Sequence, residues 1–277
     1  DQSALNIDLA RLGFEPATFE MLKRCISRPY GLLLETGPTG SGKTTTLYSI
    51  LNRLNKDDIK ILTAEDPVEF NFKGINQVPV REDIGMTFAA ALRAFLRQDP
   101  DIIMVGEIRD IETAEIAIKA AMTGHLVFST LHTNDAPGAV TRLIDMNVEP
   151  FLLTSPIEGV LAQRLVRTVC PGCKEPYQPP QELLDDLGVT EEMAEGVTFY
   201  KGKGCADCNY TGYRGRIGIF EFLTITDPIR EMILNREPTS VIRRQARREG
   251  MKSMREDGWD KIVRGVTTLE EIVRETQ

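Results

Sequence analysis

Long apolar runs are absent from this sequence of 277 residues. No uninterrupted stretch approaches the roughly 18 apolar residues that a membrane-spanning helix needs. Aromatic residues make up only 6% of the chain, which leaves little material for the stacking platforms that bind single-stranded nucleic acid. A surplus of positive charge is also missing, because 41 acidic residues outnumber 33 lysines and arginines. The net charge of -8 argues against a nucleic-acid partner for the chain as a whole.

The chain otherwise has the composition of a packed globular protein, with 42% hydrophobic and 27% charged residues. Short apolar runs bounded by Gly, Pro, Asp or His alternate with longer amphipathic stretches, and this pattern is typical of βαβ units around a mainly parallel sheet. The predicted strands cover residues 30–35, 59–64, 102–105, 126–130 and 217–222. The sequence therefore predicts an α/β fold.

A glycine-rich segment, GPTGSGKT at residues 37–44, fits the pattern G-x-x-x-x-G-K-[ST]. It follows a predicted strand and opens a predicted helix over residues 45–54, so backbone amides and the helix dipole can face phosphate oxygens. We expect Lys43 to reach the β- and γ-phosphates of ATP and the Thr44 hydroxyl to coordinate Mg²⁺. The alternative is a glycine-rich turn without a ligand. The predicted nucleotide-binding residues are Gly37, Pro38, Thr39, Gly40, Ser41, Gly42, Lys43, Thr44 and Thr45.

Acidic residues end two of the predicted strands. Glu65 and Asp66 follow strand 59–64, and Glu107 follows strand 102–105. The carboxyl ends of strands in an open α/β sheet meet at the ligand-binding edge, so both sites are delivered to the phosphates. One acid can hold Mg²⁺, and another can orient the attacking water. Glu69 is a weaker candidate, and its alternative is a solvated loop acid.

Only two histidines occur, and they bracket strand 126–130. His132 lies at the carboxyl end of that strand, which favours a phosphate-sensing role. His125 lies at the opposite end, and we interpret it as structural. The alternative for either residue is a satisfied structural histidine.

Four of the five cysteines form two C-x-x-C pairs, Cys170 with Cys173 and Cys205 with Cys208, separated by residues 174–204. Four thiolates in two tight turns predict a structural zinc site with no open position. Iron–sulfur ligation and redox dithiols are alternatives. Disulfides are a further one, although they are rare in the cytosol, where we expect this chain to lie. Cys25 has no partner and is interpreted as a small buried hydrophobic residue.

Three further segments resemble the type II secretion and type IV pilus assembly ATPases. Residues 65–69 (EDPVE) resemble the Asp box of that family, residues 106–110 (GEIRD) its atypical Walker B, and residues 123–134 its His box. The resemblance implies that Glu65 is the general base, that Glu107 holds Mg²⁺ through water and that His132 contacts the γ-phosphate. Order and spacing match along the whole chain.

The resemblance also implies a RecA-like P-loop domain in a homo-hexamer at the cytoplasmic face of the inner membrane. Such a ring drives pilin-like subunits out of the membrane into a pilus or pseudopilus. It works with an inner-membrane platform protein, to which N-terminal domains outside this chain would dock.

Several arginines are candidates for reaching nucleotide, some of them across a subunit boundary, as the resemblance suggests. Arg93 and Arg97 are four apart and share one face of a predicted helix over residues 89–97. Arg109 follows Glu107 by two positions, and Arg81 lies in a loop upstream. The alternative is an ordinary surface or salt-bridging arginine. The basic, glycine-rich turn 211–216 is interpreted as an interface or packing element.

These patterns divide the chain into a P-loop ATPase core (1–165), an inserted tetracysteine zinc module (166–216) and a mainly helical C-terminal subdomain (217–277). Thr268 with Glu271 predicts a capping box that opens the last helix. A nucleic-acid-translocating ATPase built on a zinc ribbon is the alternative function, and the acidic chain disfavours it. A small-molecule kinase would leave the cysteines unexplained.

Overall fold

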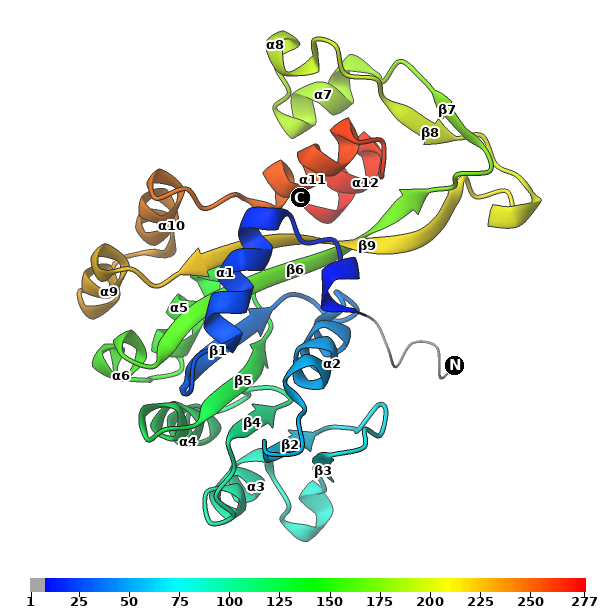
Figure 1. Cartoon of the computed structure of the whole chain (residues 1–277). Helices are drawn as coiled ribbons and strands as arrows, with labels where there is room; N and C mark the ends of the chain where they lie inside the picture. The colour runs from blue at the N-terminus through cyan, green and yellow to red at the C-terminus, as the bar shows by residue number, and fades with distance from the viewer. Residues whose placement is uncertain (1–7) are drawn as a thin grey trace.

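The protein is described by a computed structural model over residues 8–277, so the start of the expected core domain lies outside the described residues (Figure 1). A seven-stranded sheet in the order β3-β2-β4-β5-β1-β6-β9 forms its centre. Neighbouring strands run parallel, except that β9 is antiparallel to β6. The strands are β1 (Gly31–Thr36), β2 (Ile61–Glu65), β3 (Ile75–Pro79), β4 (Ile102–Val105), β5 (Leu126–Leu131), β6 (Ile157–Val169) and β9 (Tyr213–Thr224).

The mainly parallel α/β sheet confirms the fold predicted from sequence. β1, β2, β4 and β5 are buried at every position, as strands covered on both faces must be. β3 and β6 were not predicted. β3 is a polar edge strand, and β6 carries Gln163, Arg164 and Arg167 among its apolar residues, so neither has a continuous apolar run.

Helices cover both faces of the sheet (Figure 1). On one face, α1 (Pro16–Ile26) and α2 (Lys43–Leu54) pack through a cluster that includes Leu22, Leu47 and Phe128. On the other face, α3 (Phe88–Phe95), α4 (Ile111–Met122) and α5 (Ala136–Asp145) join a larger cluster. Both faces of the sheet are thereby shielded from water, and the edge formed by the carboxyl ends of its strands remains accessible to a ligand.

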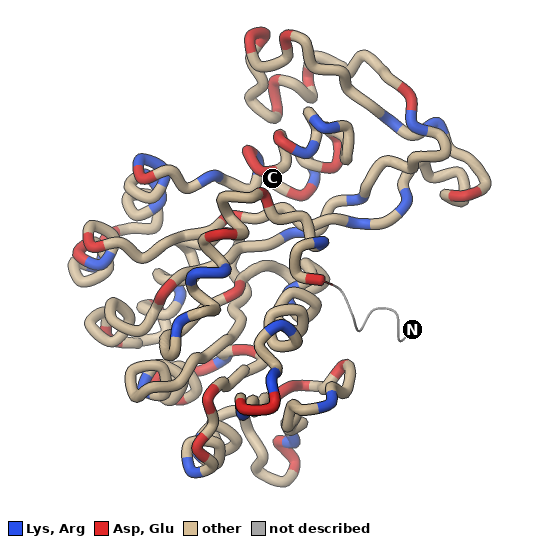
Figure 2. The backbone as a smooth tube through the Cα atoms, in the orientation of Figure 1, with Lys and Arg blue, Asp and Glu red and all other residues tan. Residues whose placement is uncertain are grey.

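The cysteine-bearing segment between β6 and β9 forms a separate lobe with a two-stranded sheet of β7 (Lys174–Pro176) and β8 (Tyr200–Gly202). The lobe also contains two short helices, α7 (Gln181–Leu187) and α8 (Glu191–Ala194). Acidic residues crowd these two helices (Figure 2). Because β6 and β9 each continue across an expected domain limit, the three-way division remains a prediction.

The remaining helices are short. α6 (Pro150–Thr154) precedes β6, and the chain ends in α9 (Asp227–Leu234), α10 (Thr239–Arg248), α11 (Met254–Val263) and α12 (Leu269–Glu275). Single 3₁₀ turns occur at η2 (Leu9–Arg11), η3 (Glu82–Ile84) and η4 (Ala206–Cys208). Across residues 8–277, no helix is both long enough and apolar enough to cross a membrane.

Only one of the two hydrogen bonds of the capping box predicted for α12 forms, so the prediction is wrong for the other. The Thr268 hydroxyl does accept a hydrogen bond from the Glu271 amide. The Glu271 carboxylate, however, accepts bonds from the backbone N and from Nε of Arg167 on β6, at 2.8 and 3.0 Å. A buried carboxylate gains more from a guanidinium than from a single amide, so α12 is tied to the sheet.

Candidate nucleotide site and cysteine cluster

A cavity of about 650 Å³ lies at the carboxyl edge of the sheet. It brings together the glycine-rich loop with the segments that follow β2, β4 and β5, as expected for this edge. The lining residues are Thr39, Gly40, Ser41, Gly42, Lys43, Thr44, Thr45, Leu47, Glu65, Asp66, Pro67, Glu69, Phe88, Met104, Gly106, Glu107, Thr130, His132, Leu165 and Arg216.

The glycine-rich loop curls tightly over β6. Gly37 and Gly42 have φ angles of 152° and 94°. A Cβ at Gly37 would lie 2.5 Å from the carbonyl oxygen of Gln163, and one at Gly42 would lie 2.7 Å from its Nε2, so side chains are excluded at both positions.

The same loop leaves α2 open at its N-terminus. The helix begins at Lys43, and no side chain of the described residues caps it, so its first amides are free to bind an anion. Lys43 Nζ donates to the carbonyl oxygens of Gly37 and Pro38 at 2.7 and 3.0 Å. Burial lowers the pKa of Lys43, while the acidic Glu35 opposes that effect. These two hydrogen bonds hold the Lys43 ammonium under the loop, next to the expected phosphate position.

Glu65 borders the cavity but is only 3% exposed. Its Oε1 accepts hydrogen bonds from Thr63 Oγ1 at 2.6 Å and from Gln77 Nε2 at 3.0 Å, and its Oε2 accepts one from the Tyr48 hydroxyl. Burial and the neighbouring Glu65 carboxylate raise the pKa of Tyr48 strongly, which keeps the phenol a donor. Neither Tyr48 nor Gln77 was singled out from sequence, because neither belongs to a recognisable pattern.

Glu107 lies between the side chains of Arg109 and His132. His132 Nε2 is 3.2 Å from its Oε2, and Arg109 Nη2 donates to its Oε1 at 2.5 Å. Partial burial would raise the pKa of Glu107, but the hydrogen bonds from Arg109 and His132 hold it below its ordinary value. Arg109 also donates to Asp66 at 3.1 Å. The segments after β2 and β4 are therefore joined by one guanidinium.

None of the four candidate arginines lines the cavity in residues 8–277, although Arg109 bonds Glu107 at its border. Arg93 forms an exposed ion pair with Glu112. The prediction that Arg93 and Arg97 share one helical face is wrong for Arg97, because α3 ends at Phe95. Arg97 lies in the tighter turn that follows, where its amide donates to the Ala94 carbonyl. Arg81 pairs with Asp83, also at the surface.

Two residues near the cavity were not expected there. Arg216, read from sequence as part of an interface or packing turn, lines the cavity from β9. Glu35 on β1 is 1% exposed, and neither of its carboxylate oxygens finds a hydrogen-bond partner in residues 8–277. Burial raises the pKa of Glu35 well above its ordinary value, although Lys43 opposes that shift.

His125 lies at the amino end of β5, away from the cavity. Its Nδ1 is 3.0 Å from the carbonyl oxygen of Ala120 at the end of α4. This placement agrees with the structural interpretation.

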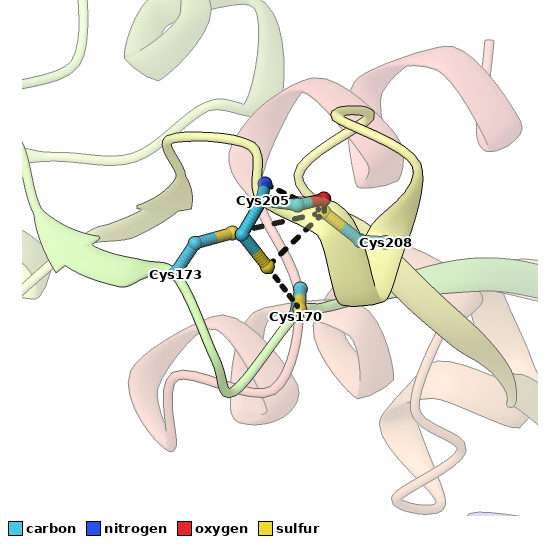
Figure 3. Close-up of side chains that lie close together, drawn as sticks. All are labelled: Cys170, Cys173, Cys205 and Cys208. Carbon is cyan, nitrogen blue, oxygen red and sulfur yellow. Dashed lines mark hydrogen bonds between the residues drawn. The ribbon is translucent and has the colours of Figure 1, made fainter.

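The four cysteines converge at the far end of the β6–β9 ribbon (Figure 3). Three Sγ–Sγ distances, Cys170–Cys205, Cys173–Cys208 and Cys205–Cys208, are each 3.8 Å, and all four sulfurs lie within 4.8 Å of one another. Four thiolates bound tetrahedrally to zinc at about 2.3 Å would be separated by about 3.8 Å. The separation is far too long for a disulfide, and all five cysteines are free thiols.

The electrostatics of the cluster also suit a cation. Amides of Cys205 and Gly212 donate to the Cys208 sulfur at 3.2 and 3.3 Å, and they lower the pKa of Cys208 to about 6. Removal from water and the neighbouring thiols raise the pKa of Cys173 to about 12. Four thiolates this close repel one another, so all of them could ionise together only around a cation.

Comparison with known proteins gives consistent matches. The model of the family described as "Type II/IV secretion system protein" matches residues 1–274. The type IV pilus assembly ATPase PilB of Myxococcus xanthus (strain DK1622) is 55% identical over the whole chain, which covers 49% of that protein. The type II secretion system ATPase E of Vibrio cholerae serotype O1 (strain ATCC 39315 / El Tor Inaba N16961) is 51% identical over the whole chain, which covers 54% of it.

A solved structure supports the same grouping. The pilus retraction motor PilT with bound ADP superposes with a TM-score of 0.70 at 31% identity, covering 97% of this chain and 66% of that one. The chain spans about half the length of the two curated relatives described above. With a family model matched over almost its entire length, the chain belongs to the type II/IV secretion system protein family.

Proposed function

We propose that the chain is the core of an ATPase that hydrolyses Mg-ATP and powers the assembly or export of pilin-like subunits. The observation that carries this proposal is the single cavity that Lys43, Glu65, Glu107 and His132 all line. Names of the relatives support it, since they are ATPases of type IV pilus assembly and type II secretion, and the similar PilT structure holds ADP. These names give the nucleic-acid-translocating alternative no support.

Five side chains of the cavity have distinct roles in the proposed chemistry. The amides at the start of α2 and the Lys43 ammonium would bind the phosphates, with Thr44 and, through water, Glu107 holding Mg²⁺. The ion would neutralise phosphate charge in the transition state. Glu65 would accept the proton of the attacking water, and His132 would contact the γ-phosphate. Arg109 would have to leave Glu107 or rearrange when the ion binds, because both compete for one carboxylate.

A structural zinc ion would complete the cysteine cluster. Cys170, Cys173, Cys205 and Cys208 would be its ligands, and four thiolates leave no position for substrate. The ion would hold the lobe formed by β7, β8, α7 and α8 in shape. We also propose the division into a core (1–165), a zinc module (166–216) and a helical C-terminal subdomain (217–277).

The working assembly is proposed to be a hexamer at the cytoplasmic face of the inner membrane, acting with a platform protein there. Arg93, Arg97 and Arg109 are the arginines proposed to act on nucleotide. Arg93 and Arg97 lie outside the cavity of their own chain, so they would act on the nucleotide of a neighbour. An arginine supplied in this way is worth about 10³ to 10⁵ in rate in other P-loop systems.

The direct test measures ATP turnover and nucleotide binding of two variants. Lys43→Ala should abolish turnover and weaken nucleotide binding, because it removes the cation under the phosphates. Glu65→Gln should bind nucleotide with nearly unchanged affinity and hydrolyse it poorly, because an amide cannot take the proton. Retained turnover in Lys43→Ala would refute the assignment of this loop, and normal turnover in Glu65→Gln would place the base elsewhere.

A further inference from the structure

Tyr48 connects the helix of the glycine-rich loop to Glu65. It lies on α2 and is 6% exposed. Its hydroxyl donates a hydrogen bond to Oε2 of Glu65 and accepts one from the backbone N of Glu69 at 3.2 Å. Its ring contacts those of Phe70 and Phe72 edge-on, with centroids 6.4 and 4.9 Å away. One side chain thus holds both the carboxylate and the loop that follows it.

The acceptor sites of Glu65 are nearly filled by the protein. A carboxylate offers about four acceptor positions. Thr63 and Gln77 use two of them on Oε1, and Tyr48 uses one on Oε2. Glu65 still borders the cavity, so the remaining position is available for a water molecule there. With three fixed donors, the carboxylate can present that position in only one orientation.

Gln77 fixes the same loop from β3. Its Oε1 accepts a hydrogen bond from the Phe72 amide at 2.8 Å, and its Nε2 donates to the Phe70 carbonyl as well as to Glu65. Residues 66–72 are therefore anchored at two points, by Tyr48 from α2 and by Gln77 from β3. The Tyr48 hydroxyl therefore links α2 directly to the Glu65 carboxylate at the end of β2.

We propose that Tyr48 is a positioning residue that orients Glu65 toward the attacking water and couples it to the phosphate-binding end of α2. This inference rests on the proposed ATPase function. Within the described chain Tyr48 is not among the residues that line the cavity, whereas its neighbour Leu47 is. Loss of its hydroxyl should therefore slow the chemical step and leave nucleotide binding intact, because orientation of reacting groups governs rate.

The test compares Tyr48→Phe with Ser49→Ala. Ser49 is a matched control, because it lies on the same helix, is also buried and donates its hydroxyl to the Thr45 carbonyl within α2. Tyr48→Phe should lower kcat by about tenfold to a hundredfold with KM changed less than about threefold, and Ser49→Ala should change neither appreciably. In the Glu65→Gln background, Tyr48→Phe should cost little further rate, because both changes remove the same interaction.

A second measurement does not depend on turnover. Hydrogen exchange of residues 66–72 should accelerate in Tyr48→Phe and in Gln77→Met, because each variant frees one anchor of the loop, and it should stay unchanged in Ser49→Ala. Wild-type kcat in Tyr48→Phe, or equal losses in the Glu65 and Glu65→Gln backgrounds, would overturn the inference while the ATPase assignment stands. Absence of turnover in the wild type, or its persistence in Lys43→Ala, would instead overturn the proposed function and this inference with it.

Discussion

The Thr46 hydroxyl donates a hydrogen bond of 2.6 Å to Oε1 of Gln163, and both side chains are buried. Thr46 belongs to the first turn of α2, whereas Gln163 lies on β6 directly beneath the glycine-rich loop. β6 then continues to Val169, and Cys170 is the next residue. One strand therefore supports the phosphate-binding loop at one end and begins the cysteine cluster at the other.

Removing one partner of this hydrogen bond should destabilise the protein. Thr46→Val leaves the Gln163 amide buried without its donor, and we expect a loss of about 1–3 kcal/mol in the free energy of unfolding, measured by denaturant titration. Adding Gln163→Leu to that variant should cost less than the sum of the two single changes, since neither residue then lacks a partner. Strictly additive losses would show that the two side chains do not depend on each other.

Metal removal should loosen the cysteine lobe. We expect about one zinc ion per chain, and removal by a chelator should lower the melting temperature. Trp259 is the chain's one tryptophan, and its ring lies 6.1 Å from that of Phe199 in the lobe, so its fluorescence should change as the ion leaves. Cys173→Ser should reproduce the effect. Cys25→Ala, which removes the buried thiol outside the cluster, should leave the metal content unchanged. A wild-type protein that is kept reduced and still contains no zinc would contradict the assignment.

Glu221 should make stability depend on pH. The residue is 4% exposed on β9, and its Oε1 accepts a hydrogen bond from the Ala136 amide at 2.9 Å. Burial raises its pKa from 4.5 to about 7. Because the folded state binds this proton more tightly than the unfolded state, the contribution is fully present below about pH 4.5 and is lost as the pH rises through about 7.

The variant Glu221→Gln cannot ionise and should lack this dependence. Its free energy of unfolding, relative to wild type, should increase by up to about 3 kcal/mol between pH 4.5 and 7.5. The exposed Glu231→Gln serves as a control and should follow the wild-type curve. Parallel curves for wild type and Glu221→Gln would show that Glu221 titrates normally.

Turnover per chain should rise steeply with protein concentration if a neighbour completes the nucleotide site. Arg97→Ala should lower the rate reached at high concentration by about 10³-fold or more, as loss of an arginine supplied in trans does elsewhere. Arg53→Ala, an exposed arginine near the end of α2, should leave that rate unchanged. Turnover that is robust and independent of concentration would instead indicate a self-sufficient monomer.

Patterns confined to a few neighbouring residues were predictable from the sequence. The glycine-rich loop forms between β1 and α2, in the predicted context of a strand before it and a helix after it. The acids Glu65 and Glu107 reach one edge because parallel strands place their carboxyl ends together. The alternation of apolar and polar residues and the spacing of a motif extend over one strand or one helical turn. They can therefore be interpreted without knowing which segments pack against them.

Other features depended on contacts between segments far apart in the chain. Arg216 enters the cavity only because β9 pairs with β6, and β6 itself could not be recognised from its mixed sequence. The Glu271 carboxylate bonds Arg167 instead of completing its helix cap, because the fold brings a guanidinium closer. In the sequence Glu35 is one more polar residue at a strand end, yet the fold buries its carboxylate with no hydrogen-bond partner among residues 8–277. Spacing along the chain determined which groups this protein has for binding phosphate and metal, whereas burial and the partners of each charged group were decided only when distant strands and helices packed together, since desolvation and hydrogen bonding act through space.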